Sequence, residues 1–221
     1  PVLVFHTADA VEEDVAGVET LLADAGAIDA GTISLAEQFL SAEGADQLKS
    51  IVANTLPAGA QISEDRLDPG LHAGEALGSA LLLNPETGEE QSSSEERGLL
   101  LRALRDAGFL DYEDGTILPA QVAVVVTGDA SEGLESRNLA DFVGALDGRG
   151  NGAVLAGRIH TAADTGAVGL VRAEETGVST VDSVDRAVGR MATVLAVREQ
   201  LEGESGAYGS AESAEAASPA P

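Results

Sequence analysis

The chain has no cysteine and few aromatic residues, and each shortage excludes a class of structure or chemistry. Without cysteine, disulfides, thiolate metal sites and cysteine nucleophiles are all excluded. Because aromatic residues make up only 3% of the chain, the core must be built mainly from alanine, valine and leucine. Small aliphatic side chains of this kind suit a sheet packed closely between layers of helices.

Positive charge is scarce too, because 12 basic residues stand against 38 acidic ones and leave a formal net charge of -26. Lys49 is the only lysine. A surface this acidic repels nucleic acid and anionic lipid, so we expect no nucleic-acid partner.

Long apolar runs are also missing, since no stretch approaches the roughly 20 apolar residues of a membrane-spanning helix. The chain nevertheless starts inside an apparent strand, PVLVFH. We therefore expect that a segment preceding Pro1, such as an anchor or a signal, has been removed.

What the chain does contain is an alternation of short apolar strands with helical patterns. Strands are predicted at residues 2–5, 27–35, 122–126, 154–156 and 178–181, with helical segments between them at 36–55, 71–83, 93–107 and 139–146. The dipeptide Asp114-Gly115 predicts a hairpin turn joining residues 109–113 to residues 116–118. This order indicates an α/β fold of three layers, Rossmann-like, with a mostly parallel sheet, helices on both faces and an added β-hairpin.

One domain is expected to span residues 1–203, followed by a low-complexity, disordered tail at 204–221. The last helix is predicted to end near Glu202 and to face the core with an apolar stripe. That stripe comprises Val184, Val188, Met191 and Leu195. Helix starts are predicted from two capping boxes, which pair Asp9 with Glu12 and Ser93 with Glu96.

A candidate ligand crevice is predicted where two strands end, at Thr7, Asp9, Gly128 and Asp129. Open α/β sheets bind ligands at the carboxyl ends of their strands, which is the reason for this choice. Gly128 and the glycine five residues later have the spacing of a phosphate-binding loop. However, Leu134 and Glu135 follow where lysine and a hydroxyl residue are needed, so we expect no nucleotide and no other cofactor there.

The sequence contains no complete catalytic or metal-binding set. Its three histidines, His6, His72 and His160, are far apart in sequence, and the single methionine, Met191, is predicted to be buried. Copper(I) prefers thiolate or thioether ligands and copper(II) prefers clustered imidazoles. We therefore expect neither a metal site nor catalytic residues.

Several stretches together resemble the MctB/SteB family of mycolic-acid bacteria, whose members are described as copper transporters. The resemblance covers residues 1–203 and rests on the order of the stretches, because none is diagnostic alone. They are TISLAEQFL (32–40), LPAGAQIS (56–63), LRALRDAGFLDY (101–112), VVVTGD (124–129), VLAGR (154–158), and VSTVDSVD with GRMATVLAVREQLEG (178–203).

The resemblance implies a domain outside the cytoplasmic membrane, on its periplasmic face, anchored by an N-terminal helix and a coiled-coil segment absent from this chain. It implies two roles, which are copper homeostasis across the envelope and control of cell-wall peptidoglycan hydrolysis at the septum with a membrane partner called SteA. We expect a non-enzymatic domain that binds protein and forms a homodimer through the implied coiled coil. Its further partner would be a coiled-coil segment of a peptidoglycan hydrolase, and copper transport is the alternative role.

Overall fold

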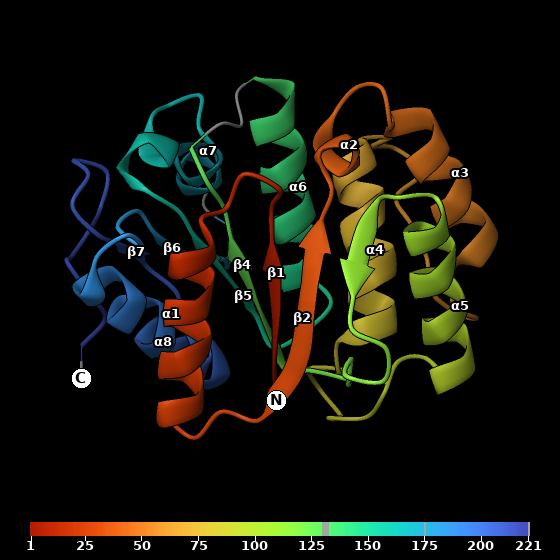
Figure 1. Cartoon of the computed structure of the whole chain (residues 1–221), viewed down its shortest axis with the longest axis horizontal. Coiled ribbons are helices and arrows are strands. Elements are labelled where there is room, and N and C mark those ends of the chain that lie inside the picture. Colours follow the sequence, from red (N-terminus) through yellow and green to blue (C-terminus); the bar gives the residue numbers. More distant parts are fainter. Residues whose placement is uncertain (130–132, 175, 221) are drawn as a thin grey trace.

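The protein is described by a computed structural model that covers residues 1–129, 133–174 and 176–220. Its strands form one sheet in the order β3-β2-β1-β4-β5-β6-β7 (Figure 1). Every neighbouring pair is parallel except β2 and β3. The strands are β1 (Val2–His6), β2 (Asp29–Leu35), β3 (Leu110–Tyr112), β4 (Val122–Val126), β5 (Ala153–Ala156), β6 (Ser179–Val181) and β7 (Ala207–Tyr208).

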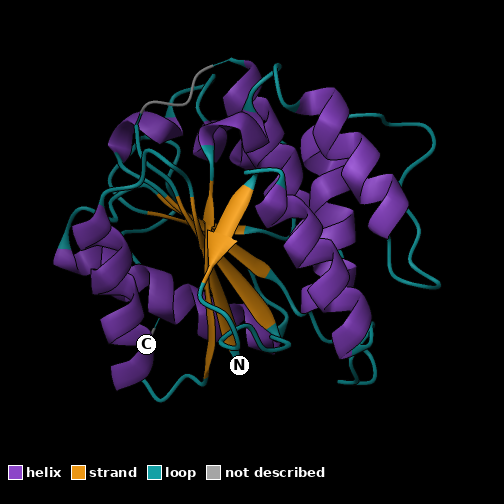
Figure 2. Ribbon diagram, turned by 45° about the vertical axis from the view of Figure 1, so that its right-hand side comes forward, coloured by secondary structure: helices purple, strands orange, loops and turns teal. Residues whose placement is uncertain are grey.

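Helices lie on both sides of the sheet (Figure 2), and this confirms the predicted three-layer, Rossmann-like α/β fold. One face is covered by α1 and α8, and the opposite face by α2 to α7. The helices are α1 (Glu12–Asp24), α2 (Glu37–Leu40), α3 (Ala45–Thr55), α4 (Pro69–Leu81), α5 (Ser94–Asp106), α6 (Leu134–Asp147), the 3-10 turn η1 (Ile159–Ala162), α7 (Ala167–Ala173) and α8 (Ala187–Glu202).

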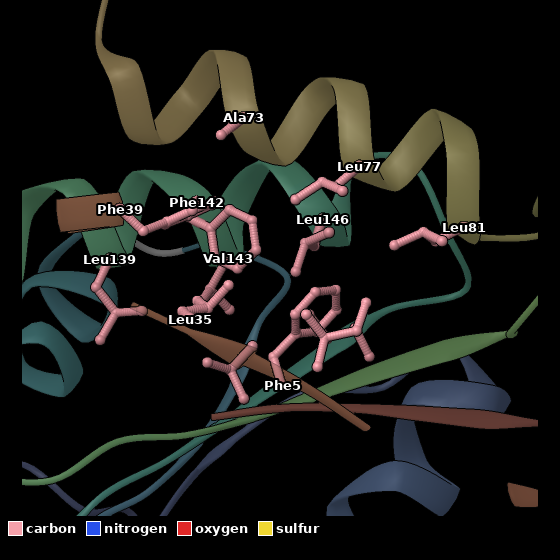
Figure 3. Packing of buried hydrophobic residues seen from close by; sticks show 14 of the residues in the cluster. Phe5, Leu35, Phe39, Ala73, Leu77, Leu81, Leu139, Phe142, Val143 and Leu146 are labelled. Carbon is pink, nitrogen blue, oxygen red and sulfur yellow. The ribbon is translucent and has the colours of Figure 1, made fainter. Parts of the chain in front are cut away.

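Side chains of each strand alternate between two separate cores. In β1, Val2 and Val4 face α1 and α8, whereas Leu3 and Phe5 face the other helices. Phe5 meets Phe142 of α6 edge to face, with ring centroids 5.5 Å apart, in the core shown in Figure 3. Phe142 also meets Phe39 of α2 edge to face, with ring centroids 5.2 Å apart, so three of the few aromatic side chains gather in this core.

The buried helix α4 lies directly on α6 (Figure 3), and glycines of α4 make the closest contacts. A Cβ added at Gly70 would lie 2.0 Å from the Asn138 carbonyl oxygen, and one at Gly74 would lie 2.4 Å from that of Phe142. Gly78, one turn further along, faces instead the side chain of Arg149, which follows α6, and a Cβ at Gly78 would lie 2.7 Å from the Arg149 Cβ. Gly70 and Gly74 therefore let the two helix backbones come into direct contact.

The capping box of α5 is confirmed. Ser93 Oγ accepts a hydrogen bond from the Glu96 N–H, and the Glu96 carboxylate accepts one from the Ser93 N–H. The carboxylate also accepts from the Ser93 hydroxyl and from Ala58 N–H, and these hydrogen bonds lower the pKa of Glu96 to about 2.

The predicted β-hairpin is wrong. The turn forms, with Gly115 at φ +81°, and the segment before it becomes β3. However, β3 pairs with β2, and the residues after the turn also approach β2, where Leu118 N–H donates to the Ala30 carbonyl. Both arms of the turn therefore pack on β2, and neither pairs with the other.

The prediction that the apolar stripe of the last helix faces the core is also wrong, because most of the stripe faces solvent. Val184 is buried, but it precedes the helix, and the exposed fractions of Val188 and Met191 are 48% and 56%. The face that packs on the sheet carries small residues together with a valine and a glutamine: Gly189, Ala192, Thr193, Ala196, Val197 and Gln200. Small side chains allow the helix to approach the flat valine surface of β4 and β5 closely, so the larger side chains point outward.

The C-terminal tail differs from the predicted disordered segment, because part of it continues the sheet. Residues Ala207–Tyr208 form β7 beside β6, so β6 is not the last strand as the sequence suggested. Composition alone led to the expectation of disorder, since alanine, serine, glycine and glutamate dominate the tail. Its single tyrosine, Tyr208, is buried and anchors the strand.

Candidate functional site

The carboxyl ends of β1 and β4 lie side by side at the point where the strand order reverses (Figure 1). The chain leaves β1 toward β2 on one side, whereas β4 is followed by β5 on the other. Thr7 N–H donates to the Val126 carbonyl, which holds the two strand ends together. Ligands bind at this position in open α/β sheets, and the predicted crevice residues lie at this edge of the sheet.

Three of the four predicted residues meet there. Thr7 Oγ1 donates to Asp9 Oδ1 over 2.5 Å and accepts from Gly128 N–H at 3.4 Å. A Cβ at Gly128 would lie 2.0 Å from the Asp9 carbonyl oxygen, so the Asp9 turn rests directly on Gly128. Asp129 is exposed beyond this contact. The Asp9 turn therefore leaves no room for a ligand between itself and Gly128.

The prediction that Asp9 caps the first helix is wrong, because Asp9 belongs to the turn that precedes this helix. The helix begins after Val11, and no side chain caps it. Asp9 instead accepts the Thr7 hydroxyl hydrogen bond, and it closes the turn that follows β1.

A hollow of about 320 Å³ remains beside this turn. Its lining comes from the turn after β1, from α2 and from the start of α6, and consists of Thr7, Ala8, Asp9, Ala36, Glu37, Leu40 and Glu135. All three charged residues in this lining are carboxylates. Carboxylates repel phosphate at a helix N-terminus, which agrees with the expectation that no nucleotide binds here.

The histidines lie on separate elements. His6 ends β1 on an open polar part of the sheet beside Thr32 and Ser34, and His160 lies exposed in η1. His72 is buried in α4, where its Nε2 lies 2.9 Å and 2.8 Å from the carbonyl oxygens of Ser63 and Arg66. Because both of these groups are acceptors, Nε2 must carry a proton, and this nitrogen is therefore not free to coordinate a metal.

Within the described ranges, no three histidine, aspartate or glutamate side chains are grouped so that they could hold a metal ion. Met191, the single thioether, projects from the exposed face of α8, apart from any histidine-bearing element. The part of the chain that the structure describes therefore offers no soft or clustered ligand set for copper.

The surface that sequence reasoning missed is the outer face of α8. Val188, Met191 and the half-buried Leu195 form a row that we call the α8 stripe. Next to it, α1 and α8 enclose an open groove of about 410 Å³ lined by Glu13, Ala16, Gly17, Thr20, Leu21, Ala187 and Arg190. The helical period of the stripe was visible in the sequence, but its exposure depends on which face packs on the sheet.

Comparison with known proteins finds one family whose members resemble this chain over most of its length. The family model described as "Copper transport outer membrane protein, MctB" matches residues 1–219. "Copper transporter MctB" of Mycobacterium tuberculosis strain H37Rv is 37% identical over 210 residues, which are 91% of this chain and 67% of that protein. The protein of the same name from Mycobacterium leprae strain TN is 37% identical over 220 residues, or 94% of this chain and 69% of that protein.

These relatives are named as transporters, and their names describe no enzyme. Among the described residues, no helix combines the length and the apolar character needed to cross a bilayer. The match to the family model extends over almost the whole chain, and the identity exceeds one third over nine-tenths of it. This chain therefore belongs to the MctB family, as its sequence resemblance implied.

Proposed function

We propose that this chain is an extracytoplasmic, non-enzymatic domain that binds a helical protein partner through the α8 stripe. The observation that carries the proposal is the exposure of Val188 and Met191 on one face of a helix in an otherwise strongly acidic protein. Exposed aliphatic side chains that lie in a row are typical of protein-binding surfaces. Methionine is favoured on such surfaces because its flexible side chain adapts to different partners.

The charge around the α8 stripe supports this choice. Residues 186–202 contain three arginines and two glutamates, so this helix is nearly neutral within a chain of net charge -26. The centre of a protein interface is depleted of charge, and the α8 stripe meets that condition. The groove between α1 and α8 lies beside it and can receive further apolar side chains of the partner.

The partner that fits is an amphipathic helix with apolar anchors spaced three and four residues apart. Basic residues on the flanks of those anchors would complement the acidic remainder of the domain and would speed association. We choose a coiled-coil segment of a peptidoglycan hydrolase as this partner, because a heptad repeat spaces apolar anchors three and four residues apart. Its capture would place the domain in the control of cell-wall hydrolysis at the septum, together with a membrane partner of the SteA type.

The cellular part of this proposal is supported by the sequence resemblance to the MctB/SteB family. The same resemblance supports an N-terminal membrane anchor and a homodimer. An enzymatic role finds no support in the relatives' names, which describe transporters, and the turn of Asp9 narrows the crevice at the strand ends.

We expect titration calorimetry with synthetic hydrolase coiled-coil segments to find one that binds the wild-type domain, with an affinity that falls as salt is raised. Met191→Glu should weaken this binding at least about tenfold, because it places a charge in the centre of the apolar surface. Leu67→Glu is the matched control, since Leu67 is exposed to a similar degree in the loop before α4. Equal losses in both variants, or turnover of a small molecule without any peptide binding, would contradict the proposal.

The relatives' name favours copper handling as a second candidate function. For this domain we expect no tight copper binding, because the described residues provide neither clustered imidazoles nor paired thioethers. Competition against a colorimetric copper chelator, with copper(I) and copper(II) in turn, should leave the metal on the chelator. Stoichiometric, sub-micromolar binding that is lost when His6, His72 and His160 are replaced together would instead establish the copper role.

A further inference from the structure

The C-terminal tail is held on the sheet in the manner of a bound peptide. Thr180 N–H of β6 donates to the Gly206 carbonyl at 2.9 Å, and Asp182 N–H donates to the Tyr208 carbonyl at 3.1 Å. These are the hydrogen bonds of a parallel strand added to a sheet edge. They depend on the backbone alone and would accept any extended segment.

Two buried charged residues hold the segment that follows the strand, chiefly through its backbone. The Asp182 carboxylate accepts hydrogen bonds from the N–H groups of Ser210 at 2.6 Å and Ala211 at 3.2 Å. Arg172 donates to the Tyr208 carbonyl through Nη2 and to the Ser213 hydroxyl through Nη1, each at 2.8 Å. Both side chains are almost completely buried, so they would lose partners inside the protein if the tail left.

The tail residues Tyr208 and Gly209 fit this edge specifically. The Tyr208 ring is buried, and its hydroxyl donates to Glu199 of α8 at 2.5 Å. Gly209 has φ +133°, and a Cβ there would lie 2.2 Å from Asp182 Oδ1. A larger residue at this position would therefore collide with the carboxylate that holds the next two N–H groups.

Part of the receiving edge is held by contacts that do not involve the tail. Arg172 of α7 donates to Asp182 Oδ2 at 3.0 Å and to Thr180 Oγ1 at 2.9 Å, so the two charges also bind each other. The connection from α8 to β7 runs through Gly203, Glu204 and Ser205, all of which are exposed. The tail therefore follows an exposed connection and docks on a pair of charges that has partners of its own.

From this arrangement we infer that the edge of β6 is a peptide-binding site, selective for an extended segment in which tyrosine is followed by glycine, and that residues 205–213 occupy it as a tethered ligand. The chemistry of recognition is a tyrosine hydroxyl for Glu199, two consecutive N–H groups for Asp182 and a carbonyl for Arg172. The site does not involve the α8 stripe, so it does not depend on the proposed function.

The tether explains how the site is controlled. A segment joined by a short flexible linker has an effective concentration on the order of millimolar, which excludes a weakly binding free peptide. Release of the tail would expose the edge of β6 to a segment of similar chemistry on another chain.

The test uses the whole chain of residues 1–221 and a fluorescent synthetic peptide covering residues 204–216, with binding followed by anisotropy. Wild-type protein should bind the peptide weakly. The variant Tyr208→Ala/Gly209→Val, whose own tail no longer fits, should bind it at least about tenfold more tightly because the tethered competitor is gone. Glu212→Gln, an exposed change in the same tail, is the matched control and should behave as wild type.

Two further measurements distinguish loss of the binding site from loss of the fold. Arg172→Gln added to the double variant should remove peptide binding, and circular dichroism should confirm that each protein is folded. If that triple variant does not fold, peptides carrying Tyr208→Ala or Gly209→Val test the same contacts on the unchanged double variant and should not bind. A folded double variant that binds the peptide no better than wild type, or that binds the altered peptides equally well, would overturn the inference.

Discussion

Replacing Gly74 by valine should lower the free energy of unfolding by about 3 kcal/mol, because the backbones of α4 and α6 are already in contact at this point. A Cβ alone would lie 2.4 Å from the Phe142 carbonyl oxygen and 2.6 Å from the Ala145 Cβ. The gain from removing glycine from a helix, up to about 1 kcal/mol, offsets only part of this cost. Urea unfolding followed by circular dichroism measures the difference.

Gly144 of α6 provides the matched control. It is also a helical glycine, but a Cβ there would meet no atom within 4 Å. Gly144→Ala should therefore stabilise the protein by up to about 1 kcal/mol, through helix propensity alone. A Gly74→Val protein as stable as the wild type would show that the two helices are farther apart than the structure places them.

Replacing Asp14 by alanine should cost about 3 kcal/mol, near the lower end of the range for breaking a buried ion pair. The Asp14 carboxylate is buried in α1 and accepts hydrogen bonds from Arg158 Nε at 2.9 Å and from Arg190 Nη2 at 2.8 Å. It thus joins α1 to α8 and to the loop after β5. Without it, two guanidinium groups lose their shared partner, although both retain partial access to water.

Glu13 is the control for this prediction, because it is the neighbouring carboxylate and approaches the same Arg190, at 3.9 Å. Its side chain is 85% exposed, and Glu13→Ala should change stability by less than about 0.5 kcal/mol. Thermal and urea unfolding of both variants give the comparison. Equal effects of the two substitutions would contradict a special role for Asp14.

The sheet was largely predictable from the sequence, because its central strands are continuous apolar runs such as Val122–Val126 and buried parallel strands have this pattern. The hairpin was not predictable, since Asp114-Gly115 specifies a local turn but not the strand that its arms will join. Pairing with β2 depends on a segment about 80 residues earlier in the chain, which no turn signal encodes.

The predictions for the α8 stripe and for the C-terminal tail were wrong for different reasons. The α8 stripe was assigned to the core because large aliphatic residues at helical spacing are usually buried, whereas this sheet accepts the face of small residues instead. The tail was assigned to disorder by composition, although the contacts that hold it are made by Tyr208, Gly209 and two backbone N–H groups. Single specific contacts of this kind leave little trace in composition.

At the candidate crevice, the position in the fold could be predicted from the sequence, but the conformation of the chain there could not. Strand ends follow from topology, so Thr7 and Gly128 were expected to meet, and they do. That the Asp9 turn would lie on Gly128 depends on backbone conformation after β1, which residue types alone do not determine.

The position of β1 in the sheet has a consequence for how the domain folds. This strand comes first among the strands of the sheet, yet it pairs with β4 on one side, and residues 7–121 separate the two. Until β4 has joined the sheet, one edge of the apolar strand VLVFH remains unpaired and can recruit strands from other chains. We therefore expect slow folding, dominated by this long-range pairing, and a tendency to aggregate while β1 lacks its partner.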